Sequence, residues 1–269
     1  MDNNKIQLIE FFRKNIKGKK PDVSNLNNKH DGKYGHWLEA QFKIHHNASN
    51  NADILGFELK NETSSKTTFG DWSANEYIFD LPDFFSVFTE KTKLDRREHF
   101  LKIFGKPNQD KDGRFSWSGE PCPKIELYNR FGQRLSVVEN NDIIAEYSFS
   151  KDLRVDKEET IPSVLKKENL IIARWYGNST PKGKKGKCLK RKLEDKFNDK
   201  GWFTCKTDSS GVYSKICFGE PMTFNNWISL VRKGIVFFDS GMYQGNPRPY
   251  SQWRANNNYW DSLITERYS

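Results

Sequence analysis

The stretch Asn51-Ala52-Asp53-Ile54-Leu55-Gly56-Phe57-Glu58-Leu59-Lys60 decides the fold that the sequence predicts. Its second half alternates between apolar and charged side chains. If it forms a strand, Phe57 and Leu59 point into a core, because successive side chains of a strand point to opposite faces. Glu58 and Lys60 then lie side by side on the other face. The stretch therefore predicts a strand with one apolar side and one charged side.

Asp53 precedes Glu58 by an odd number of residues, so a straight strand would place the two carboxylates on opposite faces. To join Glu58 and Lys60, the chain must bend between the two carboxylates. Gly56 is the natural place, because a glycine within a strand often marks a tight bend. With this bend, two carboxylates and a lysine converge on one point.

This group of side chains suits metal-dependent phosphodiester hydrolysis. Mg²⁺ prefers carboxylate oxygens and keeps several of its waters, so Asp53 and Glu58 would hold the ion. A cation there polarises a phosphate oxygen and lowers the pKa of a bound water. Lys60 would position that water or offset charge on the phosphorus. The competing interpretation is a solvated strand face with an ordinary Glu–Lys pair, because the pattern D-x4-E-x-K is short and common.

A second motif lies upstream of this strand. Gly32-Lys33-Tyr34-Gly35-His36-Trp37-Leu38-Glu39 leads into a short apolar-periodic helix through Phe42 and Ile44. The order G-x-x-G-x-x-L-E, a short spacer, D and then G-x-E-L-K resembles the nuclease core of the mismatch-repair nicking endonuclease MutH. It is even more similar to the MvaI/BcnI group of Type II restriction endonucleases, where the spacing between the Asp and the Glu is similarly short. The resemblance covers residues 32–60 in register.

The resemblance implies a PD-(D/E)xK fold and Mg²⁺-dependent cleavage of double-stranded DNA. Carried over residue by residue, it makes Asp53 and Glu58 the metal ligands and Lys60 the catalytic lysine. Glu39 becomes the helix carboxylate that borders the site.

Composition agrees with a protein that binds a polyanion. The formal net charge is +9 at pH 7, which favours a nucleic acid over a membrane surface. The 20 Phe, 10 Tyr and 8 Trp supply a sizeable core. No apolar run approaches a transmembrane span, and the N-terminus lacks the apolar segment of a signal peptide. The cysteines have no C-x-x-C spacing and are expected to be reduced thiols of a cytoplasmic protein: Cys122, Cys188, Cys205 and Cys217.

We predict a mixed α/β (α+β) fold, a PD-(D/E)xK restriction-endonuclease-like core with a central mixed sheet flanked by helices, plus a basic DNA-recognition lobe. Residues 1–269 are expected to form a single nuclease chain, with a catalytic lobe over about 1–105 and a DNA-gripping and recognition lobe over about 106–269 that shares the core. Hydrophobic periodicity predicts helices at residues 3–16, 35–43, 91–104, 189–199 and 224–232. Strands are predicted at 57–60, 67–69, 124–128, 134–138, 143–149, 170–176, 202–207, 212–218 and 235–238.

Two segments are candidates for DNA contacts. The first is a glycine-broken basic run, in which lysines suit phosphate contacts: Lys182, Lys184, Lys185 and Lys187. A solubilising surface loop is an equally good interpretation of this run. The second segment, residues 239–254, mixes amide, arginine and aromatic side chains, the types that read base edges: Tyr243, Gln244, Arg248, Tyr250, Gln252 and Arg254. A structured loop that wraps back on the core is the alternative there.

The sequence therefore predicts a sequence-specific, Mg²⁺-dependent Type II restriction endonuclease that acts on a short palindromic or pseudo-palindromic site in double-stranded DNA. The resemblance to MvaI/BcnI implies a monomer that cuts the strands one after the other and a CC(N)GG-like target. A cognate DNA methyltransferase is the expected genetic partner, and it need not bind physically.

Two alternatives stay open at this point. A MutH-like mismatch-repair nicking endonuclease would cut one strand and respond to a partner ATPase. A non-catalytic DNA-binding module would keep the fold without the chemistry, and the intact Asp53, Glu58 and Lys60 argue against it.

Overall fold

The computed structural model describes residues 2–22, 33–44, 50–61 and 65–269. The chain divides into two compact units: unit 1 comprises residues 1–68, 192–224 and 255–269, and unit 2 comprises residues 69–191 and 225–254. Each unit is thus assembled from segments that are far apart in sequence. The expected division of labour between residues 1–105 and 106–269 concerns function and stays a prediction.

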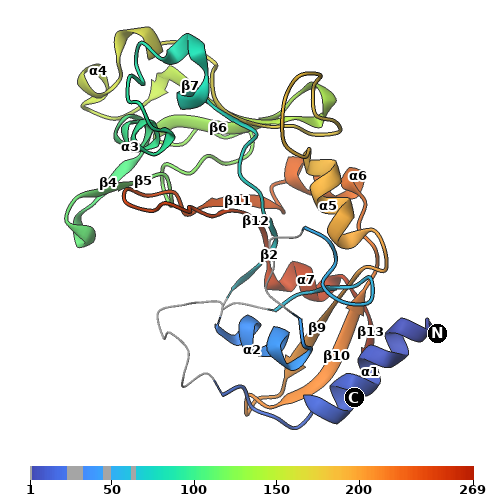
Figure 1. Ribbon diagram of the computed structural model, residues 1–269. Helices are drawn as coiled ribbons and strands as arrows, with labels where there is room; N and C mark the ends of the chain where they lie inside the picture. Colours follow the sequence, from blue (N-terminus) through green and yellow to red (C-terminus); the bar gives the residue numbers. More distant parts are fainter. Residues whose placement is uncertain (1, 23–32, 45–49, 62–64) are drawn as a thin grey trace. The chain divides into compact units, whose positions relative to one another are not determined.

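Unit 1 is built on a four-stranded mixed sheet with the order β1-β9-β10-β13 (Figure 1). β1 runs parallel to β9, whereas β10 is antiparallel to both β9 and β13. The elements of this unit are α1 (Asn3–Asn15), α2 (Lys33–Gln41), β1 (Glu58–Leu59), β9 (Trp202–Thr207), β10 (Tyr213–Gly219), α7 (Asn257–Ser262) and β13 (Ile264–Tyr268). The chain passes from one unit to the other at or within β2 (Lys66–Asp71), α5 (Leu189–Phe197), α6 (Phe224–Arg232) and β12 (Ser251–Asn256).

The two faces of this sheet pack against different helices. On one face, Leu59 and Phe203 belong to a core that also contains apolar side chains of α1 and α2. On the other face, Trp202 packs edge-on against Trp260 of α7, with ring centroids 4.9 Å apart. The register pairs Leu59 with Phe203 and Glu58 with Trp202, so Glu58 lies on the Trp202 face. The predicted alternation along this stretch is confirmed.

Unit 2 contains an antiparallel sheet with the order β3-β8-β7-β6, the hairpin β4-β5 and a sheet with the order β11-β12-β2. Its elements are β3 (Glu76–Tyr77), α3 (Lys93–Phe104), β4 (Lys106–Asn108), β5 (Arg114–Ser116), β6 (Phe131–Val137), β7 (Ile143–Asp152), α4 (Lys157–Thr160), β8 (Leu170–Trp175) and β11 (Phe237–Ser240). Short 3₁₀ helices are at Ile78–Asp80, Pro82–Phe84, Gln109–Lys111, Glu139–Asn141 and Ser163–Leu165.

Aromatic side chains dominate the core of unit 2. The fully buried ring of Trp253 in β12 lies 5.5 Å from the rings of both Trp175 and Trp227 and 5.4 Å from that of Phe238. Aromatic pairs at these separations add to the stability that burial already provides. Trp253 therefore fixes the strand on which the predicted base-reading side chains Gln252 and Arg254 lie.

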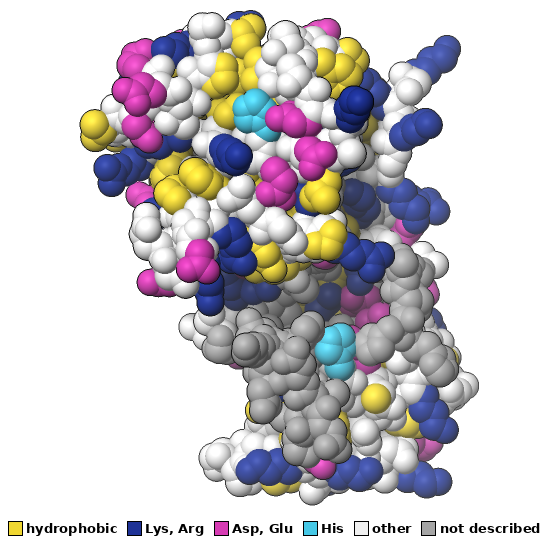
Figure 2. All heavy atoms as spheres, turned by 60° about the vertical axis from the view of Figure 1, so that its left-hand side comes forward, with side chains coloured by type: hydrophobic (Ala, Val, Ile, Leu, Met, Phe, Trp, Pro, Cys, Tyr) yellow, Lys and Arg dark blue, Asp and Glu magenta, His cyan; other side chains and the backbone are white. Residues whose placement is uncertain are grey.

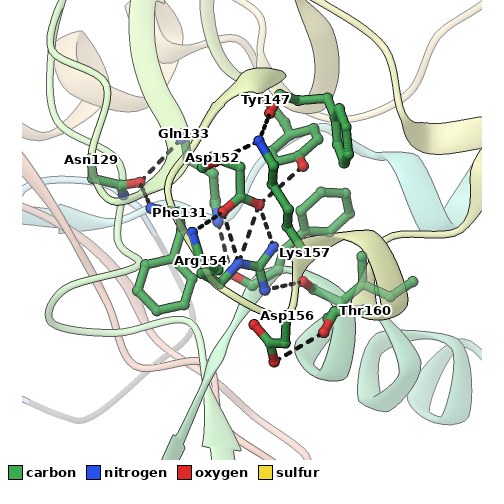
Figure 3. Close-up of polar contacts among 12 residues, drawn as sticks. Asn129, Phe131, Gln133, Tyr147, Asp152, Arg154, Asp156, Lys157 and Thr160 are labelled. Carbon is green, nitrogen blue, oxygen red and sulfur yellow. Dashed lines mark hydrogen bonds and ion pairs between the residues drawn. The ribbon is translucent and has the colours of Figure 1, made fainter.

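A buried polar cluster closes the end of β7 (Figure 3). The Asp152 carboxylate accepts a hydrogen bond of 3.0 Å from the Tyr147 hydroxyl. It also forms an ion pair of 2.6 Å with Arg154. Arg154 also donates to the Ile103 carbonyl at 2.9 Å, and Lys157 donates to two backbone carbonyls. Because Asp152 is paired with Arg154, and Arg154 and Lys157 both donate to backbone carbonyls, we interpret the cluster as a structural anchor.

Most predicted elements are present, and the differences have physical reasons. Residues 124–128, predicted as a strand, form none. Glu126 has φ of 57°, in the left-handed region, and interrupts the extended backbone. Leu127 is 69% exposed, so its apolar side chain marks no buried face. The segments that form α7 and β13 are Asn-rich and charged and carry little apolar periodicity, so the sequence predicts neither element.

The surface and the cysteines agree with the composition. On the face in Figure 2, Lys and Arg side chains are interspersed with acidic ones, so the positive charge is spread rather than gathered in a single patch. Cys122, Cys188, Cys205 and Cys217 are buried free thiols. Within the described ranges, no helix combines the length and the apolar character that crossing a membrane requires.

Candidate active site

The predicted bend before the charged strand is a tight turn. Ile54 and Phe57 exchange backbone hydrogen bonds of 3.0 and 2.8 Å, and between them Leu55 and Gly56 have φ of 51° and 83°. Two successive positive φ values are typical of a type I′ turn, which reverses the chain. Gly56 suits its position for a second reason, since a Cβ there would collide with the Asp199 carboxylate. The turn brings the residues before it back beside β1.

Asp53 is bound to the strand through this turn. Its Oδ2 atom accepts a hydrogen bond of 3.0 Å from the backbone N–H of Leu59. Asp53 as a whole residue is exposed, yet its carboxyl lies against the backbone of β1. Partial burial, together with the negative charge of Glu58, raises the pKa of Asp53 to about 6. Asp53 and Glu58 are thus electrostatically coupled carboxylates.

Glu58 and Lys60 are buried as an ion pair. They are only 2% and 7% exposed, and Lys60 Nζ lies 2.8 Å from Glu58 Oε1. The interpretation of this pair as a solvated strand face is therefore wrong. A second lysine, Lys196 of α5, donates to the same Oε1 atom at 2.7 Å. Lys60 Nζ also lies 5.1 Å from the ring centroid of Phe197, so this aromatic ring borders the cluster.

The charges of this cluster shift one another's pKa values. Burial pushes the pKa of Glu58 upward, but Lys60 and Lys196 together hold it below its usual range. Burial lowers the pKa of Lys60; the Lys196 charge adds to this effect and the Glu58 charge opposes it. A lysine in such surroundings gives up its proton more readily than one in water, which suits proton transfer or a water-positioning role.

The cluster fits a hard divalent cation. Glu58 Oε2 is buried and has no hydrogen-bond partner among the described residues, although Oε1 accepts two ammonium groups. An unsatisfied buried carboxylate oxygen is costly, and a cation would satisfy it. Asp53 offers the second carboxylate. The described part of the chain contains no group of three or more His, Cys, Asp or Glu suited to a metal. Water and substrate oxygens would complete the ligand set, as Mg²⁺ accepts.

Glu39 lies on α2, as the second motif predicts. Its Oε2 atom is 3.3 Å from His36 Nδ1, one helical turn earlier. Gly35 of the same helix lies against Asn61, the residue that follows Lys60, so this end of α2 is near the end of the charged strand. The position of Glu39 at the border of the metal site stays a prediction. Gly32, the first residue of the motif, lies outside the described residues.

The basic run is an exposed loop in unit 2. Lys182, Lys184, Lys185 and Lys187 are all exposed. The loop has internal order, since the Thr180 hydroxyl donates to the Gly186 carbonyl at 2.7 Å. Lys184 forms an ion pair of 2.6 Å with Glu76. Lys184 is therefore a weaker candidate for a phosphate contact than its neighbour Lys185.

The C-terminal segment of unit 2 holds its polar side chains in fixed positions. Arg254 donates to Gln252 on the same strand and lies 3.3 Å from Asp239 of β11. The Gln244 side chain accepts a hydrogen bond of 2.7 Å from the Phe115 N–H. By contrast, Arg248 and Tyr250 are exposed. The segment thus has ordered positions for Gln252 and Arg254 and surface positions for Arg248 and Tyr250.

Sequence reasoning missed two arginine or lysine positions near these sites. Lys196 contacts Glu58 from a helix that lies far along the chain, and no local pattern connects the two. Arg114 stacks on Tyr243, with its guanidinium 3.8 Å from the ring centroid. Arg114 belongs to β5, where the sequence pattern predicts no strand.

The chain is similar to known proteins over nearly its whole length. The family described as LlaMI restriction endonuclease matches residues 16–268 of the chain. The chain is 62% identical over 268 residues to the Type II restriction enzyme ScrFI of Lactococcus lactis subsp. cremoris, covering 99% of each protein. It also resembles the solved structure of the restriction endonuclease MvaI–cognate DNA substrate complex, with a TM-score of 0.58 and 12% identity over 100% of this chain and 98% of that one. At this identity the structural likeness concerns the fold, and it confirms the predicted restriction-endonuclease-like architecture.

Proposed function

Because this chain belongs to the LlaMI restriction endonuclease family, we propose that the cluster around Glu58 is the active site of a Type II restriction endonuclease that cleaves double-stranded DNA at a short palindromic or pseudo-palindromic site. The observation that supports this proposal most directly is the buried carboxylate of Glu58. Its Oε1 atom binds two lysines, while its Oε2 atom has no hydrogen-bond partner among the described residues. A cation would give the buried Oε2 atom a partner, and family membership supplies the reaction in which that cation would serve.

Each residue of the cluster has a distinct role in this proposal. Asp53 and Glu58 would hold Mg²⁺, and the bound ion would supply polarisation of the scissile phosphate and activation of a water. Lys60 orients the attacking water and offsets the negative charge that grows on the phosphorus in the transition state. Burial lowers its pKa, which favours a part for Lys60 in proton transfer. Glu39 acts at the border of the site from α2.

DNA contacts fall to basic and amide side chains outside this cluster. In unit 1, a cleft of about 450 Å³ begins beside Asn61, and Lys20 and Lys206 contribute to its lining. In unit 2, Lys182, Lys185 and Lys187 would grip phosphates, with Lys184 contributing if it leaves Glu76. Base reading would fall to the C-terminal residues Tyr243, Gln244, Arg248, Tyr250, Gln252 and Arg254.

The biological setting follows from this activity. A restriction endonuclease acts on DNA that enters the cell, so we place the enzyme in the cytoplasm, where its buried cysteines remain reduced. A cognate DNA methyltransferase would protect the host's own sites. We propose that the enzyme acts as a monomer and cuts the two strands in turn, on a CC(N)GG-like target.

A plasmid digest with Mg²⁺ and sequencing of the new ends tests this function. The expected result is double-strand breaks at one short sequence, with identical ends at every cut. Nicks confined to one strand would support a MutH-like activity instead. DNA binding without any cleavage across a range of Mg²⁺ and Mn²⁺ concentrations would point to a non-catalytic module.

A further inference from the structure

Lys196 is the one member of the Glu58 cluster for which the proposed reaction names no role. Its ammonium lies 2.7 Å from Glu58 Oε1, and its side chain is mostly buried. In α5, Leu193 lies one helical turn before Lys196, and Phe197 follows it directly. The side chains of Leu193 and Phe197 are fully buried. These anchors direct Lys196 toward the strand. An ordinary surface lysine would instead leave its ammonium in water.

The cluster is charge-balanced by its own side chains. Asp53 and Glu58 carry two negative charges, and Lys60 and Lys196 supply two positive ones. Lys60 comes from the charged strand itself, but Lys196 is delivered by a separate helix. That helix also meets the turn, since the Ala52 N–H donates to the Asp195 carbonyl at 3.2 Å. A divalent cation that binds Glu58 Oε2 would therefore sit close to a positive charge that the protein itself has placed there.

We propose that Lys196 is a built-in competitor of the divalent cation, and that its ammonium weakens metal binding to Glu58. This inference rests on the proposed function, because it assumes that Asp53 and Glu58 hold the metal. Like charges a few ångströms apart in a partly buried site repel strongly, whether Lys196 stays on Oε1 or has to move aside. The lysine thereby keeps Glu58 paired in the free enzyme and limits how tightly that enzyme holds a metal.

A simple positioning role would have the opposite consequence. If Lys196 served only to orient the Glu58 carboxylate, its removal would loosen a metal ligand and weaken cation binding. If Lys196 competes, its removal strengthens cation binding. The sign of the change in Mg²⁺ affinity therefore decides between the two roles.

The test is a calorimetric titration of the full chain with Mg²⁺ in the absence of DNA. Lys196→Met should lower the apparent dissociation constant of Mg²⁺ about tenfold, because one repulsive charge is gone. Lys196→Gln, which keeps a hydrogen-bond donor without the charge, should do the same and guards against a packing defect. Lys196→Arg retains the charge and should bind Mg²⁺ as the wild type does.

Two controls complete the experiment. Lys190→Met removes the same charge from an exposed position on the same helix and should leave Mg²⁺ affinity unchanged. Asp53→Ala should abolish Mg²⁺ binding, and if the wild type shows no binding that this substitution removes, the proposed metal site itself is wrong. If that control succeeds but Lys196→Met and Lys196→Gln bind Mg²⁺ equally or more weakly than the wild type, the competitor role is refuted.

Discussion

Lys60 shows how burial turns an ordinary side chain into a candidate catalyst. It is 7% exposed, and its burial and the charge of Lys196 lower its pKa, although the paired Glu58 carboxylate opposes this shift. Lys60→Ala should reduce the single-turnover cleavage rate by several orders of magnitude, because its proposed contribution is made in the transition state. DNA affinity measured without divalent cations should change little. A variant that loses affinity but cleaves bound DNA normally would make Lys60 a phosphate-gripping residue.

Asp53 gives the site a pH dependence. Partial burial and the Glu58 charge raise its pKa to about 6, so the carboxyl is ionised above that pH and protonated below it. Only the ionised form can bind Mg²⁺, because a proton and a metal ion compete for the same oxygens. Added Mg²⁺ should therefore raise the melting temperature at pH 8, and this rise should shrink as the pH falls through about 6. An Mg²⁺-induced rise of equal size at pH 5 and pH 8 would argue against Asp53 as a ligand.

The sequence predicted the identities of Asp53, Glu58 and Lys60 but not their environment. Spacing and alternation place the three residues near one another, and the structure has the turn at Leu55 and Gly56 that this requires. Spacing says nothing about Lys196, because contacts between distant segments depend on how α5 packs against the sheet. For the same reason the pair Glu58–Lys60 looked as compatible with a solvated face as with a buried site.

At the scale of elements, the turn before β1 carries measurable strain. Leu55 has φ of 51°, a region that costs a residue with a Cβ roughly 1–2 kcal/mol. Leu55→Asn should raise the free energy of unfolding by about 0.5–1 kcal/mol, because Asn-Gly is the preferred pair for a type I′ turn. Gly56→Ala should lower it by about 1 kcal/mol or more, because alanine is strained at positive φ. Chemical denaturation of both variants measures these changes, and a stabilising Gly56→Ala would contradict the assigned turn.

The secondary structure was predictable where local signals agreed. The sequence predicts a helix at residues 91–104, and α3 ends at Phe104 as expected. It begins at Lys93, because the Thr92 side chain caps it by accepting a hydrogen bond from the Asp95 N–H. The predicted strand at residues 124–128 is absent, because the left-handed backbone at Glu126 cannot be read from an apolar alternation. β13 forms because its partner β10 offers a free side, and this depends on tertiary pairing.

At the scale of the whole molecule, different residues are proposed to bind the DNA backbone and to read the base sequence. Lys185 lies in the exposed basic loop, whereas Arg254 is held by Gln252 and Asp239. Lys185→Ala should weaken binding to cognate and non-cognate DNA alike and reduce its salt dependence, because phosphate contacts carry no sequence information.

Arg254→Ala should narrow the difference between the binding free energies for cognate and non-cognate DNA by about 1–3 kcal/mol. Competition titrations at two salt concentrations distinguish these outcomes. Equal losses on both DNAs for Arg254→Ala would exclude it as a base reader.

Asp53 and Glu58 are proposed to take part in the chemistry and not merely to bind DNA. The most direct measurement compares the wild type with Asp53→Ala on one DNA fragment that contains the target, recording single-turnover cleavage with Mg²⁺ and affinity without it. We predict that Asp53→Ala abolishes cleavage while its affinity is unchanged or higher, since a negative charge near the phosphates is removed. Cleavage by Asp53→Ala at the wild-type rate at the same Mg²⁺ concentration would contradict the account.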